Sequence, residues 1–119
     1  MQDFGKLFRR ERLNAKKSMG DVARALGKSV PYVADVENAR RGPFTTEDII
    51  KAATLLGTDP EPLLAAAAIK RGRVELDTRS AKAIEVGAAL ARVWSDLDDK
   101  ELQAIATAIA HHRPGGHEK

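Results

Sequence analysis

Two short helices joined through a tight glycine turn constrain the fold of this chain more than any other feature of its sequence. Ser18 precedes Asp21 by three residues, the capping-box spacing in which each side chain can accept a hydrogen bond from the other residue's backbone N–H. The helix that begins there is expected to end at Gly27, because glycine adopts the left-handed conformation of a helix end most cheaply. Ser29 then caps a second helix, whose first turn tolerates Pro31 because the missing N–H has no partner there.

The remaining boundaries come from similar signals, namely a capping side chain at the start of a helix and a glycine at its end. Thr45 or Thr46 opens one helix and Gly57 ends it, while Asp59 and Pro60 open the next. The helices expected along the chain are about 3–13, 19–26, 29–38, 46–56, 59–69, 80–94 and 99–111. The predicted organisation is all-α, with a five-helix domain over 1–69, a linker over 70–79, a two-helix region over 80–112 and a disordered tail over 113–119.

Apolar residues recur at helical spacing and indicate which helix faces are buried. Phe4, Leu7 and Phe8 share one face of the first helix, with Leu13 as a candidate fourth member. Ala23 is expected where the two glycine-linked helices cross, because a larger side chain would push them apart. The seam between these helices is expected to contain Val22, Leu26, Val33 and Val36. Two helices joined by so tight a turn, inside a five-helix domain, are a helix-turn-helix candidate.

Charge is distributed unevenly, although the net charge of the whole chain is only +3. Residues 1–73 hold 14 Lys and Arg against 9 Asp and Glu, whereas residues 74–119 hold 6 against 8. The front part therefore carries +5 and the rear part −2. This asymmetry favours contact between a polyanion and the front part alone.

Several classes of protein and site are not expected. The chain has no cysteine, so it lacks disulfides and thiolate metal ligands, which suits a reducing cytoplasm. It has no apolar run of about 18 residues and no secretion signal. It also has no phosphate-cradling glycine loop, and its histidines (His111, His112 and His117) lie in or beside the tail, without a rigid shell for a metal. We therefore expect no enzyme activity, no cofactor and no metal site.

Residues 4–68 resemble the Cro and phage-repressor (Xre) family of DNA-binding domains. The family's run of capping Ser or Thr, Leu-Ala pair, Leu-Gly turn, Ser cap, Ile-x-x-Ile-Glu and basic stop is matched without a gap. In this sequence the run reads Ser18, Val22-Ala23, Leu26-Gly27, Ser29, Val33, Val36-Glu37 and Arg40-Arg41. The stretch "DIIKAATLLGTDPEPLL" is also similar to the family's fourth and fifth helices. The family pairs an arginine late in helix 1 with the glutamate that closes helix 3, which implies an ion pair between Arg12 and Glu37.

The resemblance also implies that the third helix lies in the major groove, with its N-terminal residues against base edges. The groove-facing residues would be Val30, Pro31, Tyr32 and Asp35. Tyr32 could stack on a sugar or donate its hydroxyl to a phosphate or a base, and Val30 and Pro31 could touch a thymine methyl. Asp35 could accept from a cytosine amino group or orient Arg40 or Arg41. The alternative is that Tyr32 and Asp35 are solvated or face a protein partner.

Polar and basic residues cluster around this helix and are expected to contact DNA phosphates: Lys17, Ser18, Lys28, Ser29, Arg40 and Arg41. Two departures from the family pattern bear on this set. Met19 stands where many family members have a phosphate-bonding Gln, which removes one contact. Ala39 stands where a Gly commonly ends helix 3, so we expect Asn38 to take the left-handed conformation instead.

The two rear helices carry apolar stripes that are expected to form a dimer interface: Ile84, Ala88, Ala91, Trp94, Leu102, Ile105 and Ile109. Dimerisation is expected because one helix-turn-helix makes few contacts, and such proteins commonly bind two half-sites about 34 Å apart. Otherwise these helices fold back on the front domain or on each other.

The sequence thus predicts a cytoplasmic, homodimeric, sequence-specific regulator of transcription from a bacterium or phage. It would bind a palindromic operator in double-stranded DNA, associate with the nucleoid when bound, and repress by blocking a promoter. The alternative is an antitoxin or anti-repressor that acts mainly through a protein partner bound by the C-terminal helices.

Overall fold

The structure, a computed structural model, describes residues 3–76 and 79–112, which form helices and no strand. The helices are α1 (Phe4–Asn14), α2 (Met19–Leu26), α3 (Val30–Glu37), α4 (Thr46–Leu56), α5 (Pro60–Arg71), α6 (Ala81–Val93), the 3-10 helix η1 (Trp94–Asp96) and α7 (Asp99–Ala110). The prediction of an all-helical chain is confirmed for this part. The chain divides into two compact units, unit 1 over residues 1–76 and unit 2 over residues 77–119. The predicted disordered tail over 113–119 lies outside the described residues, as do two residues of the predicted linker, 77 and 78.

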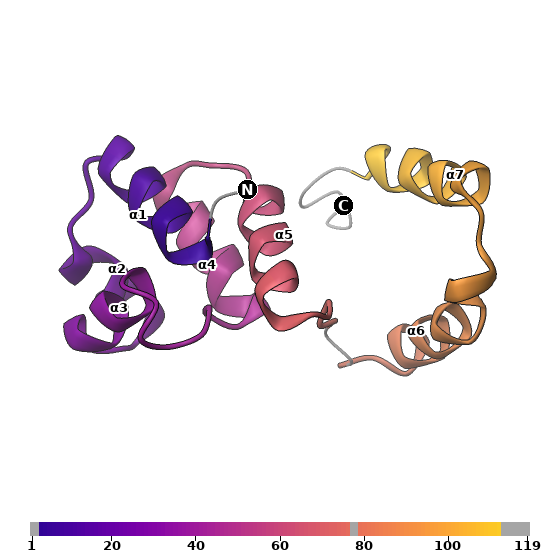
Figure 1. Cartoon of the computed structure of the whole chain (residues 1–119), viewed down its shortest axis with the longest axis horizontal. Coiled ribbons are helices and arrows are strands. Elements are labelled where there is room, and N and C mark those ends of the chain that lie inside the picture. Colours follow the sequence, from indigo (N-terminus) through magenta and orange to yellow (C-terminus); the bar gives the residue numbers. More distant parts are fainter. Residues whose placement is uncertain (1–2, 77–78, 113–119) are drawn as a thin grey trace. The chain divides into compact units, whose positions relative to one another are not determined.

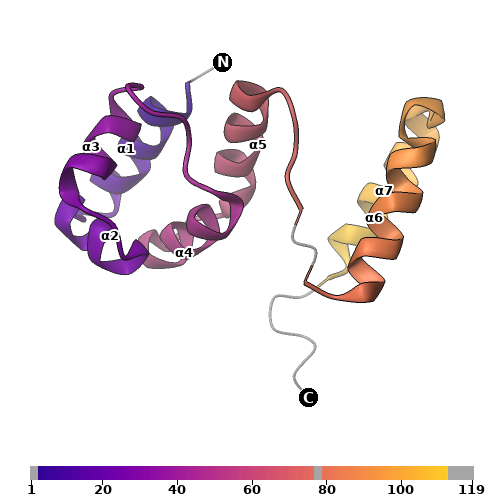
Figure 2. The same ribbon diagram turned by 90° about the horizontal axis from the view of Figure 1, so that it is seen from below.

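In unit 1, the helices α1 to α5 enclose one apolar core (Figures 1 and 2). α1 packs against α3 and α5, α2 packs against α3 and α4, and α4 packs against α5. Three rings lie at the centre: the Phe44 ring meets the Phe8 ring edge-on, with centroids 5.0 Å apart, and the Phe4 ring at 5.8 Å. Aromatic residues are few in this sequence, and three of its five share this core.

Local hydrogen bonds account for where α2 and α3 begin and end. The Ser18 hydroxyl accepts from the Asp21 N–H at 3.0 Å, and the Asp21 carboxylate accepts from the Ser18 N–H at 2.9 Å, so the capping box is formed. Gly27 ends α2 with φ of 67°. The Ser29 hydroxyl accepts from the Tyr32 N–H at 3.2 Å and starts α3. These bonds satisfy backbone donors that a helix start would otherwise leave unpaired.

Two details differ from expectation. Leu13 is 52% exposed, whereas Arg12 is buried. The reason is that Arg12 follows Phe8 by four residues and therefore takes the inward position on α1. α5 also continues to Arg71, two residues into the predicted linker. Its last turn is held there because the Arg71 guanidinium donates to the carbonyl oxygens of Pro43, at 2.8 Å, and Phe44, at 2.6 Å.

Unit 2 is built differently, because none of its described residues is buried. The helices α6 and α7 lie apart in Figure 1 instead of packing tightly on each other. A Cβ added at Gly87, in the middle of α6, would meet no atom within 4 Å. The 3-10 helix η1 includes Trp94, so α6 stops one residue earlier than expected. The described apolar residues of unit 2 are thus largely left uncovered within the unit itself.

Candidate nucleic-acid interface

The helix-turn-helix consists of α2 and α3, which meet along a buried seam. Val22, Leu26, Val33 and Val36 are all buried, as the spacing predicts. Ala23 is also buried, at the position where a larger side chain would separate the two helices. Since these residues occupy the inner faces, the rest of α3 is left to face outward.

A buried ion pair joins α1 to the end of α3. The Arg12 Nε donates to the Glu37 Oε2 at 2.6 Å, and the Arg12 Nη2 donates to the Glu37 Oε1 at 2.9 Å. The Arg12 Nη1 also donates to the Lys17 carbonyl oxygen at 3.0 Å. Hydrogen bonding to Glu37 raises the pKa of Arg12 above its ordinary value, so the guanidinium stays charged. These bonds connect α1, the loop before α2 and the last residue of α3.

Gly5 allows a second close contact between α1 and α3. A Cβ at this position would lie 2.6 Å from the Val36 carbonyl oxygen and 2.5 Å from the Glu37 carbonyl oxygen. Any larger residue would therefore force the two backbones apart. This role of Gly5 was not expected from the sequence. The available signal was a glycine inside a helical pattern, flanked at short distance by Phe4 and Phe8, which usually has a packing reason.

The exposed side of α3 carries the residues expected to face the groove. Val30 is 46% exposed, Pro31 is exposed, and Asp35 is half-buried. Tyr32 is also half-buried, because its ring packs on that of Phe44 with centroids 5.9 Å apart. Phe44 was not expected beside the interface, since nothing in the sequence links it to Tyr32.

The cationic residues expected at phosphates lie at the two ends of α3. Lys28 and Arg41 both lie over the Tyr32 ring, with the Lys28 Nζ 5.5 Å and the Arg41 Cζ 4.7 Å from its centroid. The Arg40 Nη1 lies 4.0 Å from the Asp35 Oδ1, at the outer limit of an ion pair. The structure therefore brings Asp35 close to Arg40, whereas Arg41 lies over the Tyr32 ring.

The remaining members of the expected DNA-contacting set act first as helix caps or loop residues. Ser18 and Ser29 accept backbone N–H groups with their hydroxyl oxygens, as described above, and both residues are exposed. Lys17 is half-buried, and its carbonyl oxygen accepts from Arg12. The hydroxyl protons of both serines remain available to an acceptor such as a phosphate oxygen.

The expectation for the end of α3 was wrong. Asn38 has φ of −92°, and Ala39 instead takes the left-handed conformation with φ of 61°. The Arg40 N–H donates to the Asp35 carbonyl oxygen at 2.8 Å, and the Ala39 N–H donates to the Val36 carbonyl oxygen at 3.2 Å. This is the Schellman pattern, which fixes the left-handed residue at Ala39 whatever its side chain.

The residues expected at a dimer interface differ in exposure. Ile84 and Trp94 are each 53% exposed and Ile109 is 60% exposed. Ala88 and Ala91 are exposed as well, whereas Leu102 and Ile105 are half-buried. The three largest exposed members therefore present apolar surface in both α6 and α7.

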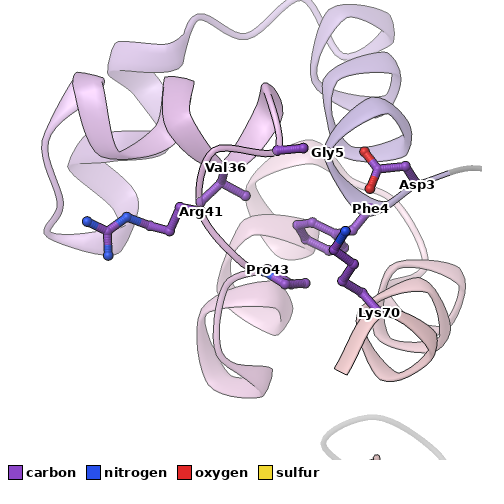
Figure 3. Close-up of a pocket in the computed structure, with 8 residues that line it drawn as sticks. Asp3, Phe4, Gly5, Val36, Arg41, Pro43 and Lys70 are labelled. Carbon is purple, nitrogen blue, oxygen red and sulfur yellow. The ribbon is translucent and has the colours of Figure 1, made fainter. Parts of the chain in front are cut away.

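A small pocket near α3 is too small for a ligand. Asp3 and Phe4 gather there with Pro43 and Lys70 around a volume of about 10 Å³ (Figure 3). That is the space of about one water molecule. The Arg41 side chain points away from this pocket in Figure 3, which is consistent with its position over Tyr32.

Residues 3–76 and 79–112 contain neither a candidate metal site nor a candidate membrane span. No group of three or more His, Asp or Glu side chains in these ranges is arranged to hold a metal ion. None of the helices in the described part combines the length and the apolar character that crossing a membrane requires.

Comparison with known proteins agrees with the geometry of unit 1. The model of a family described as "Helix-turn-helix domain" matches residues 3–67, which is more than half of the chain. The comparison with curated proteins finds no match. The family match supports a DNA-binding regulator and covers the whole of α1 to α4 and most of α5.

Proposed function

The chain belongs to the helix-turn-helix domain family, and from this premise we propose that it is a sequence-specific, homodimeric DNA-binding repressor of the Cro and phage-repressor type. The observation that carries the proposal is the outward face of α3, with cations at both of its ends. Helices of this kind enter the major groove with their N-terminal residues toward base edges, while the preceding helix crosses the backbone.

Most of the affinity would come from phosphates. Lys28 precedes α3, and Arg40 and Arg41 follow it, so the three cations lie near both ends of the helix that would enter the groove. All three residues are exposed. Cationic side chains in these positions neutralise phosphates and release counterions, which makes binding steeply dependent on salt.

Specificity would come from the front of α3. Val30 and Pro31 are exposed and apolar, and can contact thymine methyl groups. Asp35 lies close to Arg40, and this proximity favours a role of Asp35 in orienting Arg40 over a direct contact with cytosine. An operator read in this way is expected to contain thymine at the positions that face the start of α3.

Dimerisation would take place through unit 2. Two helices without one buried residue cannot supply the apolar burial that stabilises a folded unit. A second copy would cover the exposed faces of α6 and α7 and form a four-helix arrangement. Charge favours this pairing, because residues 81–93 carry a net +1 and residues 94–110 a net −3. A twofold dimer brings α6 of one copy against α7 of the other and repeats each favourable contact.

The test is fluorescence-anisotropy titration of the full chain against duplexes tiled across the DNA upstream of its own gene, since small regulators often control themselves. Each duplex is compared with a shuffled duplex of equal composition, at two salt concentrations. We expect one tile to bind at least about 10³-fold more tightly than its shuffled control, with two chains per duplex. Equal binding of all tiles and controls, at both salt concentrations, would reject a self-regulating repressor. The leading hypothesis for the function of the chain would then be that the exposed faces of unit 2 bind a protein partner.

A further inference from the structure

The Tyr32 ring is the outermost member of an aromatic cluster that begins in the core. Phe44, which is fully buried, packs on the Phe4 and Phe8 rings on one side and on the Tyr32 ring, 5.9 Å away, on the other. The position of the Tyr32 ring is therefore set by the core of unit 1. A ring packed in this way keeps its position, whereas a free side chain could move to fit a base.

Two cations that are distant in sequence lie over this ring. The Arg41 Cζ is 4.7 Å and the Lys28 Nζ 5.5 Å from the ring centroid. Both distances are within the range of about 6 Å in which a cation is attracted to the face of an aromatic ring. Lys28 belongs to the turn before α3 and Arg41 to the loop after it. Tyr32 therefore contacts the segments on both sides of the helix.

Arg41 keeps its donors free in this arrangement. No ion pair or hydrogen bond of the Arg41 guanidinium with another side chain is found within residues 3–76 and 79–112. A guanidinium that lies over an aromatic ring can keep the N–H groups at its edge available to bind a phosphate oxygen. Arg40, by contrast, lies near the Asp35 carboxylate and not over the ring.

We propose that Tyr32 is a positioning residue: its ring holds the Arg41 guanidinium in place before DNA arrives, and Tyr32 acts on affinity through Arg41 instead of reading a base with its hydroxyl. The inference rests on the proposed binding of DNA by α3. Holding a flexible arginine in its bound position removes an ordering cost from binding, which corresponds to about three- to tenfold in affinity. The gain does not depend on sequence, because a phosphate is present at every position.

The experiment compares six variants of the full chain with the wild type, on the tight-binding tile and on its shuffled control over a range of salt concentrations. The single variants are Tyr32→Phe, Tyr32→Leu, Arg41→Gln and Arg40→Gln, and the double variants are Tyr32→Leu/Arg41→Gln and Tyr32→Leu/Arg40→Gln. Circular dichroism and thermal unfolding establish that each variant is folded. We expect Tyr32→Phe to bind within about twofold of the wild type, because the ring is kept. Tyr32→Leu is expected to lose about three- to tenfold on both duplexes. Arg41→Gln is expected to lower the slope of log K against log salt by about 0.9, the value for one phosphate.

The energetic coupling between Tyr32 and Arg41 in DNA binding decides whether Tyr32 acts through Arg41. In the Arg41→Gln background, Tyr32→Leu is expected to cause no further loss, because the group that it positions is gone. The matched control adds Arg40→Gln to Tyr32→Leu, and there the two losses are expected to multiply. The proposal is overturned if the losses from Tyr32→Leu and Arg41→Gln also multiply. It is equally overturned if Tyr32→Phe loses as much as Tyr32→Leu on the specific tile alone, since that result assigns the hydroxyl to a base.

A measurement without DNA separates this proposal from the proposed function. In the NMR spectrum of the free protein, the ring current of Tyr32 should shift the Arg41 δ-methylene protons upfield. We expect this shift in the wild type and in Tyr32→Phe, and its loss in Tyr32→Leu. If the wild type failed to bind any duplex but showed the shift, the DNA function would be rejected while the holding of Arg41 stood. If the shift were absent from the wild type, the positioning role would be rejected.

Discussion

Arg12 and Glu37 form a two-point ion pair that joins the inward face of α1 to the last residue of α3, with their side chains only 8% and 1% exposed. The pair fixes the end of the helix whose front would meet DNA. Because both charges are out of water, each depends on the other for compensation.

Removing one member of this pair is expected to be more harmful than removing both. Glu37→Gln leaves the Arg12 guanidinium buried without its anion and should lower the free energy of unfolding by about 3 kcal/mol or more. The double variant Arg12→Met/Glu37→Leu should lose much less, because it leaves no buried charge. Urea unfolding of the single and double variants measures the difference. Equal losses in both would show that the pair is not electrostatically coupled.

Gly5 is expected to tolerate no side chain. Gly5→Ala places a Cβ against the carbonyl oxygens of Val36 and Glu37, and should lower the free energy of unfolding by about 2 kcal/mol or more, as for an overpacked contact. Gly42→Ala is the matched control, because a Cβ at Gly42 would meet no atom within 4 Å. Thermal unfolding of both variants tests the contact, and a neutral Gly5→Ala would contradict it.

The end of α3 offers a stabilising substitution. Ala39→Gly relieves a left-handed residue and should raise the free energy of unfolding by about 0.5–1 kcal/mol, after the added entropy of glycine in the unfolded chain is subtracted. Asn38→Gly should give no such gain, since Asn38 has φ of −92°. If Asn38→Gly stabilised the protein instead of Ala39→Gly, the left-handed residue would be misassigned.

The capping box of α2 should give stability a dependence on acid. Hydrogen bonds from the Ser18 backbone N–H and hydroxyl hold the pKa of Asp21 below its ordinary value of 3.8 in the folded state. Because this pKa is lowered in the folded state, the ionised Asp21 carboxylate stabilises the protein fully above the pKa of the unfolded state. This stabilisation is lost as the pH falls through the pKa of the folded state. The difference in unfolding free energy between wild type and Asp21→Asn should therefore be constant at neutral pH and shrink below about pH 4. A difference that remained constant into strong acid would argue against the ionised cap.

Dimerisation through unit 2 is expected to depend on Trp94. Trp94→Gln removes the largest exposed apolar side chain of this unit and should weaken the dimer by about 2 kcal/mol or more, as for other aromatic anchors. Val86→Gln is the control: Val86 is also exposed, but it lies about 160° around α6 from Ile84. Sedimentation equilibrium of both variants gives the dimer constants. A dimer indifferent to Trp94→Gln would place the interface elsewhere.

Much of unit 1 could be predicted from the sequence, because its signals are local. Ser18, Gly27 and Ser29 determine helix ends through hydrogen bonds within a few residues, and they act as expected. The features that were missed depend on distant partners. The contact of Gly5 with the end of α3 and the packing of Tyr32 on Phe44 join residues that only the folded chain brings together.

The Ala39 error has a different cause. Asparagine adopts the left-handed conformation more readily than alanine does. The hydrogen bonds at the end of α3, however, determine which position is left-handed, whatever residue stands there. A preference of about 1–2 kcal/mol is overruled when two backbone bonds and the following loop depend on that position.

The close approach at Gly5 and the ion pair of Arg12 have a consequence for how such a protein can change. Both contacts fix α3 on its buried side, through its backbone carbonyl groups and its last side chain. Val30 and Pro31, on the exposed side, take no part in these supports. A duplicated gene could therefore acquire a new operator by exchanging a few codons at the front of this helix, with the scaffold inherited unchanged.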